Sequence, residues 1–307
     1  MAILACGYIL VYFSEHLFWA HAKPDDTWLG WILTWLIYSL TSYIFLSAIA
    51  LFRLRSFWEL FLAGAIFGWL TEGIIVQTVY EELPLSISFT GLAWHALISV
   101  CMGWYALRRA IQKSLWRTAW LSALIGLVYG FWAITWWVES DGMMLTPTAD
   151  FFQFSFVATL FAILAYWLYD RCMPPGWQPS KWGLITAITI LILYFLIITV
   201  PLVPVAAVIL PLLLASVLIP LNRNRNAVPS GSMLDAAPQP HPIWRYLPLL
   251  LIPLIALTFY TLAYALEIKL RTNIVIYVLT TPPGFVLWIM GMVKLWRRKP
   301  VPEMDTA

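Results

Sequence analysis

The sequence predicts an all-α fold, a polytopic bundle of about ten membrane-spanning helices with both chain termini in the cytoplasm. Of the 307 residues, 62% are hydrophobic and 11% are charged, whereas a soluble domain has about 25% charged residues. The run from Trp28 to Phe52 contains no charged residue, and about 20 apolar residues suffice for a helix to cross a bilayer. A soluble core does not need so many runs of this length. Transmembrane strands would need short alternating segments, which the sequence lacks.

Ten apolar runs are long enough to be membrane helices, and prolines, polar turns and basic clusters separate them. The run from 182 to 221 is the least regular. Pro201 and Pro204 interrupt it, so two spanning helices or a re-entrant pair would both fit. The expected helices are 3–21, 28–52, 57–80, 86–107, 118–138, 151–169, 182–200, 203–221, 246–266 and 274–294.

The basic residues predict how the helices are threaded through the membrane. Lys23, Lys269 and Arg271 fall on one side, and the other fifteen of the 18 lysines and arginines fall on the opposite side. Because the cytoplasmic side of membrane proteins is enriched in Lys and Arg, both termini are expected there. We therefore expect a multi-pass protein of the cell membrane, in a prokaryote the cytoplasmic membrane. The net charge of +3 needs no nucleic-acid partner, since basic clusters meet anionic headgroups.

The chain is rich in tryptophan, with 19 residues of this type. Many of them fall at the predicted ends of helices, where amphipathic rings form an interfacial belt. Belt and packing roles explain most of these residues without a bound pigment or sugar.

The domain organisation follows from one long polar segment. We expect an eight-helix membrane block over 1–221, a flexible cytoplasmic linker over 222–245, a two-helix membrane block over 246–298 and a cytoplasmic tail over 299–307. A shift of 62 residues aligns GAIFGWL at 64–70 with GLVYGFW at 126–132. This similarity suggests a two-helix repeat over 64–109 and 126–171, although helix ends also resemble one another by chance.

Few ionisable residues lie at membrane depth. Glu72 precedes the predicted end of its helix by eight residues, or about 12 Å at 1.5 Å per residue. His95 lies about 14 Å into the next helix by the same rise, and Glu15 lies near the outer end of the first. A carboxylate in the bilayer costs several kcal/mol, so such residues are expected to be functional. Glu72, His95 and Glu15 are the predicted catalytic residues; a hydrogen-bonded packing role is the alternative for each.

A second group of polar and aromatic residues is expected to bind a substrate in the same outer half of the membrane. No metal site is expected, because neither HxxxH nor HExxH occurs and the three cysteines are scattered without CxxC spacing. The predicted substrate-binding residues are His16, Gln77, Tyr80, Trp94, Glu139 and Gln153.

Three classes of function fit these observations. The first is a membrane-embedded enzyme acting on a lipid or isoprenoid, in which Glu72 is the acid or base and His95 its proton partner. The second is a small ten-helix secondary transporter, although glycine is sparse and no matching pair of broken helices is evident. The third is a scaffold or cofactor-holding subunit of a membrane complex. The expected partners are the lipid bilayer and a lipid-soluble small molecule; the sequence specifies neither a cofactor nor an oligomeric state.

Overall fold

A computed structural model describes the chain except for residues 140–145, 226–230, 236–238 and 299–307. Every element assigned in the described residues is helical, and the predicted helical membrane bundle with about ten spanning helices is confirmed. Ten segments are long and apolar enough to cross a membrane. They are Ala2–Trp19, Trp28–Leu51, Phe57–Ile75, Ser86–Lys113, Leu115–Val138, Thr148–Cys172, Lys181–Leu202, Ala206–Asn224, Ile243–Ala265 and Thr272–Arg297.

The helices form two compact units whose segments alternate along the chain. Unit 1 contains residues 1–40, 102–173 and 238–280, and unit 2 contains residues 41–101, 174–237 and 281–307. The predicted blocks at 1–221 and 246–298 and the predicted 62-residue repeat stay predictions. Part of the predicted linker 222–245 and all of the predicted tail 299–307 lie outside the described residues.

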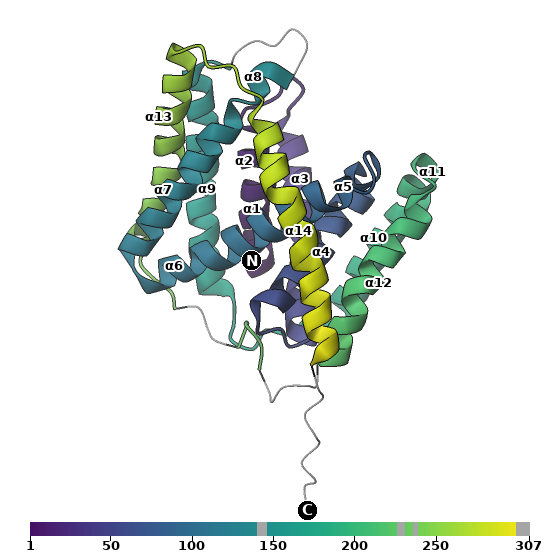
Figure 1. Cartoon of the computed structure of the whole chain (residues 1–307). Helices are drawn as coiled ribbons and strands as arrows, with labels where there is room; N and C mark the ends of the chain where they lie inside the picture. Colours follow the sequence, from purple (N-terminus) through teal and green to yellow (C-terminus); the bar gives the residue numbers. More distant parts are fainter. Residues whose placement is uncertain (140–145, 226–230, 236–238, 299–307) are drawn as a thin grey trace, which may run out of the picture. The chain divides into compact units, whose positions relative to one another are not determined.

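In unit 1, α13 (Leu251–Ala265) packs against α7 (Leu115–Ala133) and α9 (Thr148–Cys172), as Figure 1 shows. Gly126 of α7 faces the backbone of Ile252 so closely that a side chain there would clash. The ring of Phe151 stacks on Tyr260 with centroids 4.1 Å apart. α1 (Ala2–Val11) also packs against α9. Small residues and ring stacking therefore set the helix spacing, as in membrane bundles generally.

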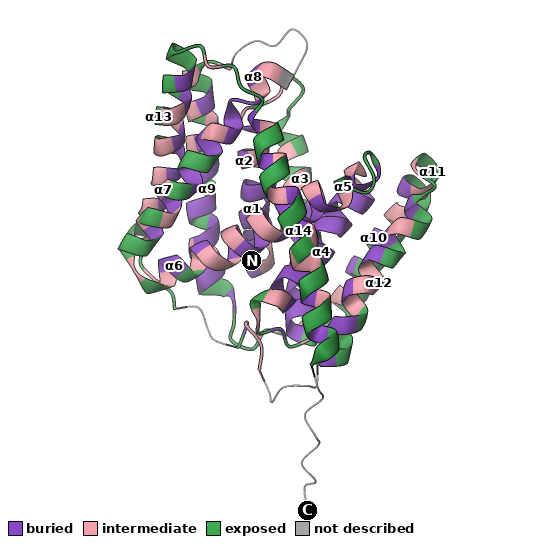
Figure 2. Ribbon diagram, in the orientation of Figure 1, coloured by how far each residue is buried: buried purple, intermediate pink, exposed green. Residues whose placement is uncertain are grey.

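In unit 2, α4 (Phe57–Leu70) is buried along nearly its whole length and packs against α12 (Ala206–Asn224). It begins with a capping box, in which Ser56 accepts from the Glu59 backbone and Glu59 accepts from the Ser56 backbone. Figure 2 shows α4 in the buried colour, whereas α10 (Lys181–Tyr194) and α12 carry many exposed residues. Those exposed residues are largely Leu, Ile and Val, as is typical of helices that face lipid.

The ends of the third and fourth helices differ most from the sequence prediction. The third spanning helix ends at Ile75 instead of residue 80, because Gln77 adopts a left-handed conformation with a φ of 75°. The fourth continues past residue 107 to Lys113. The run 182–221 forms two helices, Lys181–Leu202 and Ala206–Asn224, and each is long enough to cross a membrane. Residues 203–205 separate them.

Candidate functional site

Glu72 lies in unit 2 where the α-helical hydrogen bonding of α4 gives way to a π-helical turn, Thr71–Ile75. The side chain of the preceding Thr71 donates a hydrogen bond to the Phe67 carbonyl one turn earlier, at 3.0 Å. On the following side, Thr199 donates to the Ile74 carbonyl at 2.7 Å. Glu72 itself is only 6% exposed. Single π-helical turns are uncommon and occur frequently at functional sites.

His95 lies in a second π-helical segment, Phe89–Leu107, and is 2% exposed. Its Nε2 atom is 2.5 Å from Oε1 of Glu72. The helices Phe57–Ile75 and Ser86–Lys113, which form a helical hairpin, therefore meet at this pair. Gly68 of α4 lies against the Gly91 carbonyl and the Cβ of His95, where a side chain would clash. The ring of Phe67 packs edge-on against the imidazole, with centroids 5.5 Å apart. Close helix approach at a glycine therefore brings two titratable groups into contact.

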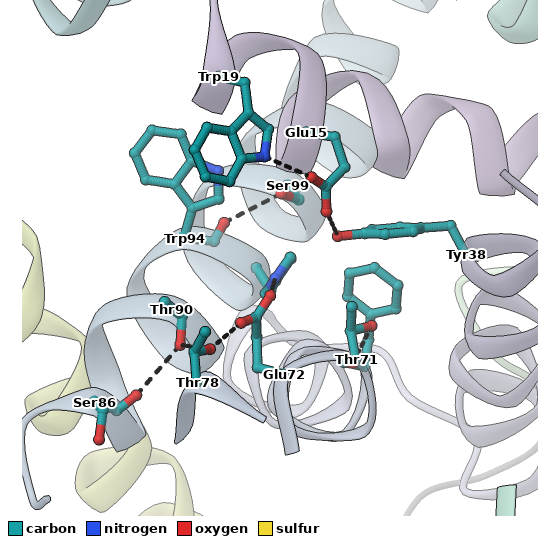
Figure 3. A network of polar contacts seen from close by, with 12 residues as sticks. Glu15, Trp19, Tyr38, Thr71, Glu72, Thr78, Ser86, Thr90, Trp94 and Ser99 are labelled. Carbon is teal, nitrogen blue, oxygen red and sulfur yellow. Dashed lines mark hydrogen bonds and ion pairs between the residues drawn. The ribbon is translucent and has the colours of Figure 1, made fainter. Parts of the chain in front are cut away.

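Hydroxyl groups continue the polar contacts beyond the pair (Figure 3). Thr78 donates to Oε2 of Glu72, so both carboxylate oxygens have partners. The Oγ1 atom of Thr90 is 3.4 Å from that of Thr78 and 3.4 Å from the carbonyl of Ser86. Glu72 and His95 are buried, whereas Thr78 and Thr90 are half-buried. The chain of hydroxyls thus leads from the buried pair toward the turn that joins the two helices.

That turn is fixed by hydrogen bonds to backbone carbonyls. Tyr80 donates to the Gly73 carbonyl at 2.7 Å, and Ser86 donates to the Val79 carbonyl at 2.6 Å. Trp69 of α4 donates to the Ile87 carbonyl of the other arm at 3.0 Å. These hydroxyl and indole groups therefore stabilise the backbone of the turn. Tyr80, a predicted substrate-binding residue, is buried and donates to a backbone carbonyl of the hairpin.

Glu15 lies in unit 1, in the π-helical turn Tyr12–His16 that follows α1. The hydroxyl of Tyr38, in α3 (Trp28–Leu51), donates to Oε1 of Glu15 at 2.5 Å. The indole of Trp19 donates to Oε2 at 3.0 Å. Figure 3 shows both hydrogen bonds. The role of Glu15 as a second carboxylate beside Glu72 and His95 stays a prediction.

His16, the neighbour of Glu15, lies among aromatic rings of unit 1. Its ring stacks on Trp31 with centroids 4.6 Å apart and meets Phe154 edge-on at 5.4 Å. Its Nε2 atom is 3.3 Å from the hydroxyl of Tyr8. The predicted substrate-binding role of His16 stays a prediction.

The remaining predicted binding residues are dispersed. Gln77 is half-buried and lies two residues after the helix that ends at Ile75. Trp94, which precedes His95 in the sequence, is buried. Glu139 is the last residue of α8 (Trp136–Glu139), and its side chain lies outside the described part of the chain. Gln153 is exposed on α9. Their roles in substrate binding stay predictions.

Sequence reasoning missed Thr78 and Thr90, although both lie in the hairpin that contains Glu72 and His95. Threonine is common in membrane helices and carries no charge penalty, so neither residue gave a signal in the sequence. Asp170 was also missed. It is fully buried at the end of α9 and accepts hydrogen bonds from Arg108 and Gln112. Its position at a predicted helix end, next to Arg171 and other basic residues, was the signal.

Within the described residues, no three His, Cys, Asp or Glu side chains lie close enough together to hold a metal ion. No family model, curated protein or solved structure matches the chain. The fold therefore defines the class: a multi-pass α-helical membrane protein with a buried carboxylate–imidazole pair in its membrane-spanning helices.

Proposed function

We propose that the protein is a membrane-embedded enzyme that uses Glu72 and His95 as an acid–base pair on a lipid-soluble substrate, such as a lipid or an isoprenoid. The observation that carries this proposal is the 2.5 Å contact between the Glu72 carboxyl group and the His95 imidazole. Two titratable groups in contact can hold a proton and pass it to a third group within hydrogen-bonding reach.

The charge balance of the pair supports proton transfer as its task. With one shared proton, the pair is neutral overall, whether the carboxylic acid faces a neutral imidazole or the carboxylate faces an imidazolium. Adding or removing a proton leaves a net charge on groups that are 6% and 2% exposed, which is costly at membrane depth. A substrate that gives or takes a proton at the same moment avoids that cost. The pair therefore favours reactions in which the proton moves together with a chemical change.

The side-chain contacts hold both residues in fixed orientations. Glu72 accepts from Thr78, so one of its oxygens is fixed while the other meets His95. The edge-on ring of Phe67 and the close backbone at Gly68 restrict the imidazole. Fixed orientation lowers the entropic cost of proton transfer. In this proposal Glu72 is the acid or base, and His95 is its proton partner.

The test compares Glu72→Gln with Glu81→Gln in the purified full-length protein. Both substitutions remove a carboxyl group nearly isosterically, but Glu81 is exposed in the turn. Each protein is incubated with lipid and isoprenoid extracts of the host membrane, and the products are compared by mass spectrometry. We expect Glu72→Gln to abolish a conversion that the wild type and Glu81→Gln both perform. A conversion that Glu72→Gln performs at the wild-type rate would contradict the proposal.

A proton-coupled transporter is the second candidate, and one packing contact in unit 2 favours it. Pro282 and Pro283 lie inside α14 (Thr272–Arg297) and remove two backbone donors. Next to them, Ser88 donates to the Thr281 carbonyl at 2.6 Å, and Gly284 packs against Ser88. The helix that contains the two prolines therefore packs against the spanning helix Ser86–Lys113, which contains His95. Proton uptake into proteoliposomes that depends on both a solute and Glu72 would favour the transporter over the enzyme.

A further inference from the structure

One end of unit 1 contains a buried acid that is fully neutralised. Asp170 accepts hydrogen bonds from Arg108 at 2.7 Å, from Gln112 at 2.7 Å and from Tyr246 at 2.8 Å. Its side chain is 0% exposed. These contacts join α6 (Arg108–Lys113), the end of α9 and the segment Ile243–Leu250. The Asp170 carboxylate is therefore fully used in contacts within the fold and is not accessible at the surface.

Basic side chains lie on the same elements as this network and at the start of the adjoining α7. Arg171 follows Asp170 directly, Arg245 donates to the Ile111 carbonyl at 3.1 Å, and Arg109 donates to the hydroxyl of Tyr105. Within the described residues, none of the five cations of this end takes part in an ion pair. We call them the basic end of unit 1; its members are Arg109, Lys113, Arg117, Arg171 and Arg245.

Exposed tryptophans lie beside these cations in the sequence and on the same elements. Trp116 and Trp120, at the start of α7, are 77% and 65% exposed, and Trp244 is 52% exposed. An exposed indole is favourable at the level of the lipid headgroups, where its ring meets apolar chains and its N–H meets polar groups. The tryptophans therefore indicate that the basic end lies at a membrane surface.

We propose that the basic end of unit 1 binds the phosphate headgroups of anionic phospholipids. Asp170 is buried and paired with Arg108, so it does not balance the charge of the exposed cations. Headgroup phosphates can balance that charge. Arginine also matches phosphate geometry with paired donors. Clusters of Lys and Arg next to membrane helices attract anionic lipids by about 1 kcal/mol per residue. This binding is independent of the Glu72–His95 pair and of its proposed chemistry.

An anionic lipid fits this surface better than a soluble polyanion. A soluble ligand would contact only the cations, whereas a phospholipid also places its acyl chains against exposed apolar residues of the adjoining helices, such as Leu115 and Leu124 of α7. In this proposal the basic residues bind the lipid headgroup, and apolar side chains of the helices contact the acyl chains.

The test uses the full-length protein and two triple variants with matched charge loss. Arg109→Gln, Lys113→Gln and Arg117→Gln remove three exposed cations of the basic end. Lys23→Gln, Lys269→Gln and Arg271→Gln remove three cations that lie outside it. Binding of phosphatidylglycerol and of phosphatidylcholine to the protein in detergent is measured by native mass spectrometry. Glycerol phosphate, which lacks acyl chains, serves as the soluble competitor.

We expect the wild type and the Lys23 triple variant to bind phosphatidylglycerol in preference to phosphatidylcholine. The Arg109 triple variant should lose roughly a hundredfold in affinity, about fivefold per removed charge. If that variant is not folded, Arg171→Gln alone should lose about fivefold. Equal affinity for the two lipids, equal losses in the two triple variants, or full displacement by glycerol phosphate would overturn the proposal.

Discussion

Two glutamates at membrane depth, Glu72 of unit 2 and Glu15 of unit 1, have different partners. Glu72 contacts an imidazole, which can accept or release a proton. Glu15 accepts hydrogen bonds from the Tyr38 hydroxyl and the Trp19 indole, which are neutral donors. Both residues lie in π-helical turns of helices long enough to span a membrane. The comparison shows that depth alone does not assign a role to a buried acid, because the partner decides whether a proton can move.

The histidines repeat this contrast. His95 pairs with a carboxyl group, whereas His16 stacks on Trp31 and approaches the Tyr8 hydroxyl. An imidazole among rings contributes packing and one hydrogen bond, and an imidazole beside an acid forms a charge-coupled pair. Unit 2 therefore contains the proposed acid–base pair, and the predicted roles of Glu15 and His16 in unit 1 stay predictions.

The largest effect on stability is expected from removing one member of the buried pair. His95→Leu leaves one oxygen of the buried Glu72 without its imidazole partner, and breaking a buried pair in this way costs about 3–5 kcal/mol. His16→Leu is the control in unit 1, where lost ring contacts cost about 0.5–1.5 kcal/mol. Thermal unfolding in detergent measures both differences.

The double variant Glu72→Gln/His95→Leu separates pairing from simple loss of volume. We expect it to be more stable than His95→Leu alone, because no buried carboxylate is left without a partner. Strictly additive losses from the two substitutions would show that the residues do not interact.

A smaller effect is expected from Tyr38→Phe in unit 1. The substitution removes the hydroxyl that donates to Glu15, and leaving a buried acceptor without its donor costs about 1–3 kcal/mol. Stability should fall by this amount while any Glu72-dependent conversion or transport continues at the wild-type rate. A loss of activity at unchanged stability would instead place Glu15 in the chemical site and remove the contrast between the units.

The smallest change in stability is expected along the hydroxyl chain. Thr78→Val removes the donor to Glu72, and Thr90→Val removes the next hydroxyl. Each neutral hydrogen bond contributes about 0.5–1.5 kcal/mol. We expect Thr78→Val to slow the Glu72-dependent activity more than Thr90→Val, because only Thr78 touches the acid. The reverse order, measured as initial rates, would exclude the chain as a route for the proton.

The sequence predicted most of the fold because the signal for a membrane helix is its length and polarity. Ten apolar runs became ten long helices. The end of the third helix was missed because Gln77 adopts a left-handed backbone conformation without being glycine or asparagine. π-Helical segments were also missed, since tertiary packing and not residue type decides where the hydrogen-bonding pattern widens.

The sequence predicted less of the candidate site. Glu72 and His95 could be expected to meet, because they lie at similar depth on consecutive arms of one hairpin. The contact of Glu15 with Tyr38 depends on the rotation of two helices about their axes, which a sequence without a strong apolar stripe does not specify. The contacts of the Thr78 hydroxyl with Glu72 and Thr90 form beyond the early helix end at Ile75, which the sequence did not predict.

The most direct measurement is nuclear magnetic resonance of the protein labelled with ¹⁵N at its four histidines, reconstituted in lipid bilayers. Assignment uses the loss of one signal in His95→Gln. We expect a far-downfield proton bound to Nε2 of His95, as a short hydrogen bond to Glu72 requires. It should disappear in Glu72→Gln and persist in Glu15→Gln. A His95 proton resonance that Glu72→Gln leaves unchanged would contradict a proton shared between Glu72 and His95.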